Sequence, residues 1–186
     1  EFYDGKFKNY YNYTNSLIER FDGISKEYEL ITGVKFDKDG NLWILNSQAP
    51  TQSLIEFNTN GEWISHTKSE LMKLDDGGFR NKSLGSLENM MIDSKGLLWF
   101  VNNHWTIPSL YFYQFSTDTI KAFTTFINED GTIVNVGSVR TIAEDKNGDI
   151  WIGTNVGPLL LEYKEITKES PIFIQVKVPR NDGTNY

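Results

Sequence analysis

One short pattern that occurs three times constrains the fold of this chain more than any other feature. Its copies align without gaps as FDKDGNLWIL from Phe36, IDSKGLLWFV from Ile92 and EDKNGDIWIG from Glu144, and they share D-x-x-G-x-[LI]-W-[IF]. The repeated positions are Asp37, Gly40 and Trp43, then Asp93, Gly96 and Trp99, then Asp145, Gly148 and Trp151. The tryptophans follow each other after 56 and 52 residues. A period of this length predicts a series of similar supersecondary units.

Each copy of the pattern predicts a β-hairpin. A short apolar stretch, such as residues 33–36, 90–92 or 141–143, ends at the Asp. The Gly that follows can adopt the positive φ that tight hairpin turns require. The next strand, which begins at Leu42 in the first copy, is apolar at successive positions. A strand without polar alternation is expected to be covered on both faces.

Two further strands complete each unit. The third strand is expected to end in an aromatic residue, at Phe57, Phe115 or Tyr163. A more polar fourth strand is predicted over residues 62–67, 120–126 and 172–178, where it suits an outer edge that faces water. Four antiparallel strands in each repeat of about 50 residues are typical of a propeller blade. The predicted fold class is therefore all-β, with β-propeller blades of four antiparallel strands.

The repeat also predicts how the chain is divided. Residues 1–15 would end a preceding blade, residues 16–67, 68–127 and 128–178 would form three blades, and residues 179–186 would lead toward a next one. A closed propeller needs about four to eight blades. About three and a half blades indicate a fragment of a larger propeller, with the remainder of a longer chain as its partner. Apolar faces on the terminal blades would also favour self-association.

The pattern resembles the two-component-regulator propeller repeat, D-x-x-G-x-L-W-x-G-T followed by a Gly and an aromatic strand. The third unit, DKNGDIWIGTNVGPLLLEY over residues 145–163, matches it almost completely, whereas Leu45-Asn46 and Val101-Asn102 replace Gly-Thr in the first two units. The resemblance implies an extracytoplasmic location, periplasmic or at the cell surface. Such repeats occur in periplasmic sensors of hybrid two-component systems that respond to glycans, and in a component of the type IX secretion machinery.

Composition excludes several classes of function. The 186 residues carry a formal net charge of −7 with no cluster of Lys or Arg, which argues against a nucleic-acid partner. The absence of Cys excludes thiolate catalysis, disulfides and sulfur-ligated metals. With two His in the chain, a three-His metal site is also excluded. We expect neither a metal nor another cofactor.

Two features of the repeat could suggest binding sites, but structural roles explain them better. The run from Asp37 to Asn41 offers oxygen ligands suited to calcium, yet the other copies replace its middle positions and a hairpin turn accounts for every residue. The three repeated tryptophans could stack on sugars, but a strand covered on both faces places them in the core. Each is expected to bury its ring and to find one partner for its indole N–H.

The candidate ligand-binding residues lie instead where the units differ. Asn103, His104 and Trp105 belong to a polar and aromatic loop over residues 102–108, and Arg80 belongs to an insertion over residues 75–82. Arg140 precedes the inner strand of the third unit, in the position of Thr32 and Glu88, and could pair with Glu88 or meet a polar ligand. An ordinary solvated loop and a structural ion pair are the alternatives.

These observations favour a non-catalytic module that recognises an oligosaccharide or a protein partner in a two-component sensor. The alternative is a structural propeller component of a type IX secretion apparatus. A second alternative is a propeller hydrolase or lyase. No pair of carboxylates stands out from the acidic residues of the turns, so we predict that the chain is not an enzyme.

Overall fold

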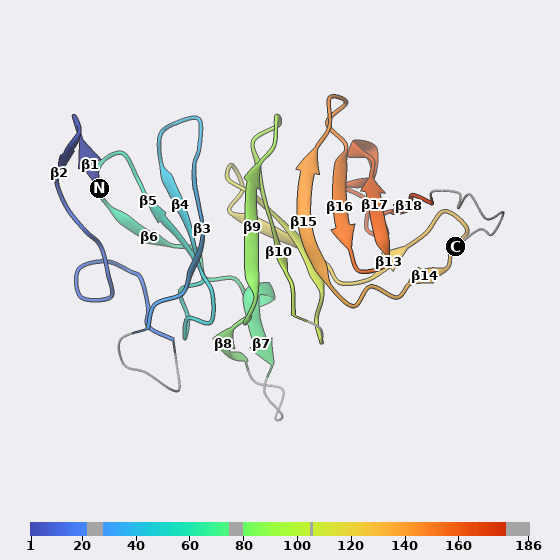
Figure 1. The fold of residues 1–186 in the computed structure, drawn as a ribbon, viewed down its shortest axis with the longest axis horizontal. Coiled ribbons are helices and arrows are strands. Elements are labelled where there is room, and N and C mark those ends of the chain that lie inside the picture. The colour runs from blue at the N-terminus through green and yellow to red at the C-terminus, as the bar shows by residue number, and fades with distance from the viewer. Residues whose placement is uncertain (22–27, 75–79, 105, 178–186) are drawn as a thin grey trace. The chain divides into compact units, whose positions relative to one another are not determined.

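The computed structural model describes residues 1–21, 28–74, 80–104 and 106–177. Within this part of the chain, three four-stranded antiparallel sheets dominate (Figure 1), and in each of them the strands pair in chain order. The sheets consist of β3 (Ile31–Phe36), β4 (Leu42–Asn46), β5 (Leu54–Phe57) and β6 (Trp63–Ser65); β9 (Leu87–Ile92), β10 (Leu97–Asn102), β11 (Ser109–Gln114) and β12 (Thr119–Phe123); and β15 (Val139–Glu144), β16 (Ile150–Thr154), β17 (Gly157–Leu161) and β18 (Ile174–Gln175). The predicted four-stranded units are confirmed.

Short elements precede the first sheet and connect the sheets along the chain. Three two-stranded pairs are formed by β1 (Phe2–Tyr3) with β2 (Lys6–Phe7), β7 (Met72–Leu74) with β8 (Arg80–Ser83), and β13 (Phe126–Ile127) with β14 (Ile133–Val134). The described residues contain no α-helix, only the 3-10 turns η1 (Ser69–Leu71) and η2 (Tyr163–Glu165). Accordingly, none of the described segments forms a helix that could span a membrane.

The chain forms two compact units, residues 1–85 and 86–186. In the first unit, Ile18, Ile44 and Ile55 form a small buried cluster. In the second unit, a larger core joins the sheet β9–β12 to the sheet β15–β18, and Trp99, Val139 and Ile152 lie within it. Burial of apolar surface is the main stabilising contribution in each unit. The predicted blade boundaries at residues 15, 67, 127 and 178 stay a prediction, and the loop over residues 179–186 lies outside the described residues.

The repeated turn forms for the reason that the sequence suggests. In the first sheet, Gly40 has a φ of +87° and its N–H donates to the Asp37 carbonyl at 3.2 Å. The Asp37 N–H in turn donates to the Asn41 carbonyl at 3.0 Å, which closes the hairpin between β3 and β4. A positive φ at this place is strained for any residue with a Cβ.

The inner strands carry an irregularity that the sequence did not suggest. The register of β3 on β4 shifts between Ile31 and Gly33, and that of β15 on β16 shifts between Val139 and Thr141. The extra residue is Thr32 in the bulge of β3 and Arg140 in the bulge of β15. A bulge bends the strand and re-aims a side chain, often beside a functional site.

The predicted outer strands need correction. Phe57 ends β5 as expected, but β11 ends one residue before Phe115, and Tyr163 lies in η2 rather than in a strand. The Tyr163 N–H donates to the Asp149 carboxylate at 2.8 Å, so a side-chain oxygen accepts this hydrogen bond in place of a carbonyl of a neighbouring strand. The fourth strands are shorter than predicted. They were expected over residues 62–67, 120–126 and 172–178, whereas β6, β12 and β18 extend over 63–65, 119–123 and 174–175.

Candidate functional site

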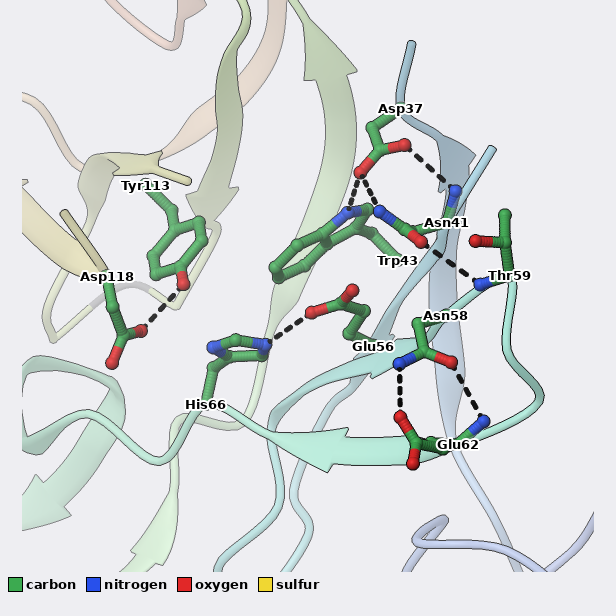
Figure 2. A network of polar contacts seen from close by, with 10 residues as sticks. All are labelled: Asp37, Asn41, Trp43, Glu56, Asn58, Thr59, Glu62, His66, Tyr113 and Asp118. Atoms are coloured by element: carbon green, nitrogen blue, oxygen red, sulfur yellow. Dashed lines mark hydrogen bonds and ion pairs between the residues drawn. The ribbon is translucent and has the colours of Figure 1, made fainter. Parts of the chain in front are cut away.

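The Asp and the Trp of each repeat are joined by a hydrogen bond. Trp43 Nε1 donates to Asp37 Oδ2 at 2.9 Å (Figure 2), and Trp99 and Trp151 donate in the same way to Asp93 at 2.7 Å and to Asp145 at 3.1 Å. The indole of the second strand therefore fixes the turn that precedes it. Trp43 and Trp99 are buried and Trp151 is half-buried, which confirms the core positions of the first two.

The other oxygen of each Asp organises the turn itself. Asp37 Oδ1 accepts the N–H groups of Asp39 and Asn41, both at 2.9 Å, and Asp93 and Asp145 accept the equivalent pairs. The indole hydrogen bond and these N–H groups hold the pKa of Asp145 below its ordinary value. Burial alone would raise the pKa of Asp37, but hydrogen bonds from Trp43 and Asn41 outweigh it and lower that pKa.

The run from Asp37 to Asn41 is occupied by its own contacts. Besides Trp43, the Asn41 amide donates to Asp37 Oδ2 at 2.9 Å, and Asn41 Oδ1 accepts the Thr59 N–H at 3.1 Å (Figure 2). These oxygens hold the first turn against the next one, between β5 and β6. Among the described residues, no group of three His, Asp or Glu side chains is placed to hold a metal ion.

A nearly buried pair of a His and a Glu adjoins this turn and was missed in the sequence. His66 follows β6, and its Nε2 lies 3.0 Å from Glu56 Oε2 on β5 (Figure 2). Its ring packs on Trp43 with centroids 4.7 Å apart. Both polar side chains are nearly buried, so the pair ties the outer strands of the first sheet to its central indole. Two residues ten positions apart on neighbouring strands carry no local sequence signal.

The opposite ends of the second strands carry a second repeated polar position. Asn46, Asn102 and Thr154 each stand three residues after a repeated Trp, where the resemblance led us to expect Thr. Asn46 Nδ2 donates to the Glu19 carbonyl, Asn102 Nδ2 to the Ile107 carbonyl and Thr154 Oγ1 to the Gly157 carbonyl. Asn46 and Asn102, which replace the Thr of the repeat, therefore still donate a side-chain hydrogen bond to a backbone carbonyl, as Thr154 does.

The loop between β10 and β11 is built on that position. His104 Nδ1 lies 2.7 Å from Thr106 Oγ1, and the Asn103 N–H donates to the Ser86 carbonyl at 2.9 Å. The side-chain oxygens of Asn102 and Asn103 are buried without a hydrogen-bond partner among the described residues. A buried acceptor left unpaired is costly, and a water molecule or a ligand donor usually satisfies it. Trp105, predicted beside them, lies outside the described residues.

Arg140 lies at the equivalent end of its own sheet, because β15 begins opposite the end of β16 as β9 begins opposite the end of β10. It is exposed, and its Nε donates to Ser138 Oγ at 3.2 Å. The Asn89 side chain donates to the Arg140 carbonyl and so links the inner strands β9 and β15. The ion pair considered with Glu88 is absent among the described contacts. Arg80 begins β8, but its side chain is not described, and residues 75–79 of the predicted insertion lie outside the described part.

Comparisons with known proteins agree with this architecture. The family model of the two component regulator propeller matches residues 134–156, which contain the third Asp–Trp turn. None of the curated proteins matches the chain. Among solved structures, the chain superimposes on PorZ, an essential surface component of the type-IX secretion system of Porphyromonas gingivalis, with a TM-score of 0.76 and 19% identity over 97% of its length.

A second solved structure is similar over less of the chain. The extracellular domain of a protein described as the hybrid two-component system BT4673 of B. thetaiotaomicron gives a TM-score of 0.51 and 17% identity over 83% of the chain. The chain spans 24% of the length of PorZ and 22% of that domain. At these identities the comparisons establish the fold. The chain therefore has the propeller-blade fold and carries a two-component-regulator propeller repeat.

Proposed function

We propose that this chain is a recognition module without chemistry of its own in an extracytoplasmic propeller protein, and that this protein is a surface component of a type-IX secretion system. The observation that favours this context is the likeness to PorZ, which extends over 97% of the chain. A role in a two-component sensor is the second candidate, favoured by the repeat over residues 134–156 and by the fold of the BT4673 domain.

The polar contacts support a non-catalytic role. The carboxylates of Asp37, Asp93 and Asp145 are engaged by the indole and the N–H groups of their own turns. Glu56 is engaged by His66 beneath the Trp43 ring. A general acid or base needs a proton or a lone pair that lies within hydrogen-bond reach of the substrate. The repeated acidic residues are therefore assigned to structure, and recognition to the loop end of the sheets.

At that loop end the available groups suit a polar partner. Asn103 and His104 present amide and imidazole groups in the β10–β11 loop, and Arg140 presents a guanidinium at the bulge of β15. A guanidinium favours carboxylates because it can donate two parallel hydrogen bonds. An oligosaccharide with an acidic sugar or an acidic protein segment would be recognised by this combination. Arg80 and Trp105 stay predicted ligand-binding residues.

Two experiments test the proposal. In the source bacterium, deletion of the gene should abolish delivery of type-IX cargo proteins to the surface. Normal cargo delivery together with altered transcription in response to glycans would instead support the sensor. For recognition, a glycan array should be probed with the full-length protein and with Arg140→Ala and His104→Ala. Lys38→Ala, in the turn between β3 and β4 of the first unit, is the control that should bind like the wild type.

The outcomes separate recognition from catalysis. Binding that is at least tenfold weaker in Arg140→Ala, with Lys38→Ala unchanged, would support a site at the loop end. Unchanged affinity in both loop variants would move the site elsewhere. Mass spectrometry of the glycans after incubation should find them intact, and cleaved products would contradict the non-catalytic role.

A further inference from the structure

An Asn lies opposite a Ser where the second and third strands of the first two sheets meet their connecting loop. Asn102 and Ser109 are directly opposite on β10 and β11. In the first sheet the pair is Asn46 and Ser53, since the Asn46 N–H donates to the Ser53 carbonyl at 3.0 Å, one step beyond the pairing of β4 with β5. Opposite residues of an antiparallel pair lie on the same face, close enough for their side chains to interact.

The loops that these pairs close are longer than the loop of the third sheet. They consist of residues 47–52 and 103–108, whereas Thr154 and Gly157 enclose only two residues. In that short loop the Thr154 hydroxyl donates to the Gly157 carbonyl at 2.5 Å and accepts the Val156 N–H at 3.1 Å. A single Thr thus closes the short loop, and an Asn with a Ser stands at the base of each longer one.

The pair in the first sheet leaves buried polar atoms without partners. Asn46 and Ser53 are fully buried, and neither Asn46 Oδ1 nor Ser53 Oγ has a hydrogen-bond partner among the described residues. The Asn46 amide cannot be turned round, because its Nδ2 donates to the Glu19 carbonyl at 3.1 Å and the exchange would set oxygen against oxygen. Thr32 Oγ1, next to the β3 residue opposite Asn46, and Gln52 Oε1, next to Ser53, are also buried without partners in this part of the structure.

A water molecule suits these groups in size and in hydrogen-bonding capacity. An unpaired buried polar atom is costly, and internal water is the usual partner of such atoms. Asn46 Oδ1 and Gln52 Oε1 can only accept hydrogen bonds, whereas the hydroxyls of Thr32 and Ser53 can both donate and accept. Water offers two hydrogens and two lone pairs, and it bridges polar groups that do not reach each other directly. Because the atoms are shielded from solvent, their partner has to be as small as water.

The second sheet has the same requirement. Asn102 is fully buried, its Nδ2 donates to the Ile107 carbonyl at 2.7 Å, and its Oδ1 has no partner among the described residues. Ser109 Oγ lies 3.0 Å from the Ile107 carbonyl and 2.9 Å from the Tyr111 hydroxyl, so its proton is already engaged. The neighbouring Asn103 Oδ1 is buried and unpaired within the described part as well. The two hydrogens of one water molecule match these two oxygens.

We propose that the base of each of these two loops binds an internal water molecule. One water joins Asn46 Oδ1 to Ser53 Oγ, and the other donates to Asn102 Oδ1 and Asn103 Oδ1. The waters replace the closure by Thr that the third unit shows, and they fix the two loops that differ from it. These sites depend on the buried groups of the loops and are independent of the proposed function.

A crystal structure of the full-length protein, at a resolution that shows ordered solvent, tests both sites. We expect one water molecule within hydrogen-bond distance of Asn46 Oδ1 and Ser53 Oγ, and another within that distance of Asn102 Oδ1 and Asn103 Oδ1. The equivalent place beside Thr154 is the internal control and should hold none, since its hydroxyl is already paired. A direct hydrogen bond between Asn46 and Ser53, or a dry site beside either Asn, would overturn the proposal.

A double-mutant cycle measures the first bridge in solution. Ser53→Ala is made in the wild type and in Asn46→Thr, which places the residue of the third unit at the base of the loop. In urea denaturation, Ser53→Ala should lower the folding equilibrium constant about fivefold in the wild type and less than about twofold in Asn46→Thr. Ser65→Ala, exposed on β6, is the matched control and should have the same small effect in both backgrounds. An equal effect of Ser53→Ala in the two backgrounds would contradict a shared water.

Discussion

The hydrogen bond between Asp93 and Trp99 offers the sharpest test of how the repeat stabilises its sheet. The bond is 2.7 Å long, both side chains are buried, and the Asp also accepts the N–H groups of Lys95 and Leu97. In Asp93→Asn the side-chain oxygen can keep the backbone bonds, but the new amide places a donor against the indole N–H. A buried donor left unsatisfied costs about 1–3 kcal/mol.

A double-mutant cycle isolates this contribution from packing. Trp99→Phe removes the indole N–H and retains an aromatic ring, and it is combined with Asp93→Asn. Hydrogen bonds to charged groups contribute about 1.5–3 kcal/mol, so the coupling free energy should lie in this range. Trp99→Ala should cost more, about 3–5 kcal/mol, because a cavity remains in the core.

The assay is equilibrium urea denaturation followed by circular dichroism on all variants. The coupling free energy is the decisive quantity, because either single substitution could also perturb packing. A coupling free energy below about 0.5 kcal/mol would mean that the Asp serves the turn alone and that the indole contact adds nothing.

Three further predictions follow from the same contacts. Gly153→Ala places a Cβ 2.5 Å from Thr141 Cγ2 and should destabilise the fold by about 1–3 kcal/mol, and Thr141→Ser, which lacks that methyl group, should restore most of the loss in thermal denaturation. The pKa values of Asp145 and Glu165 are lowered in the folded state by their hydrogen bonds from Trp151 and Lys168, so the melting temperature should be constant near neutral pH and fall as the pH drops below about 4. A chelator should leave the melting temperature of the wild type unchanged. If it lowers the melting temperature of the wild type but not that of Asp37→Asn, calcium binding by the run from Asp37 to Asn41 would be supported instead.

Most of the fold could be predicted because the repeat encodes it locally. The Gly of each turn and the continuous apolar run after it lie within ten residues, so Gly40 and Trp43 indicate a hairpin without any tertiary information. The Asp–Trp bond could also have been predicted, since its spacing of six residues is the same in all three copies. The ends of the outer strands could not, because tertiary contacts such as that of Tyr163 with Asp149 decide them.

The candidate site was predicted only in outline. The loop with Asn103 and His104 and the position of Arg140 were found by contrast with the repeated residues, which are committed to turn and core. The pairing of His66 with Glu56 and the bulge at Arg140 depend on the register between strands. A one-residue change of register redirects side chains, and a single sequence does not encode it explicitly.

The central claim is that each repeat fixes its own turn through an indole hydrogen bond. Hydrogen exchange of the indole N–H groups in a chain labelled with ¹⁵N-tryptophan tests it most directly, with each signal assigned by a Trp→Phe variant. We expect Trp43, Trp99 and Trp151 to exchange more slowly than Trp63, and Trp99 to be the slowest because it is fully buried. Exchange at any of the three repeated positions as fast as that of Trp63 would contradict the claim.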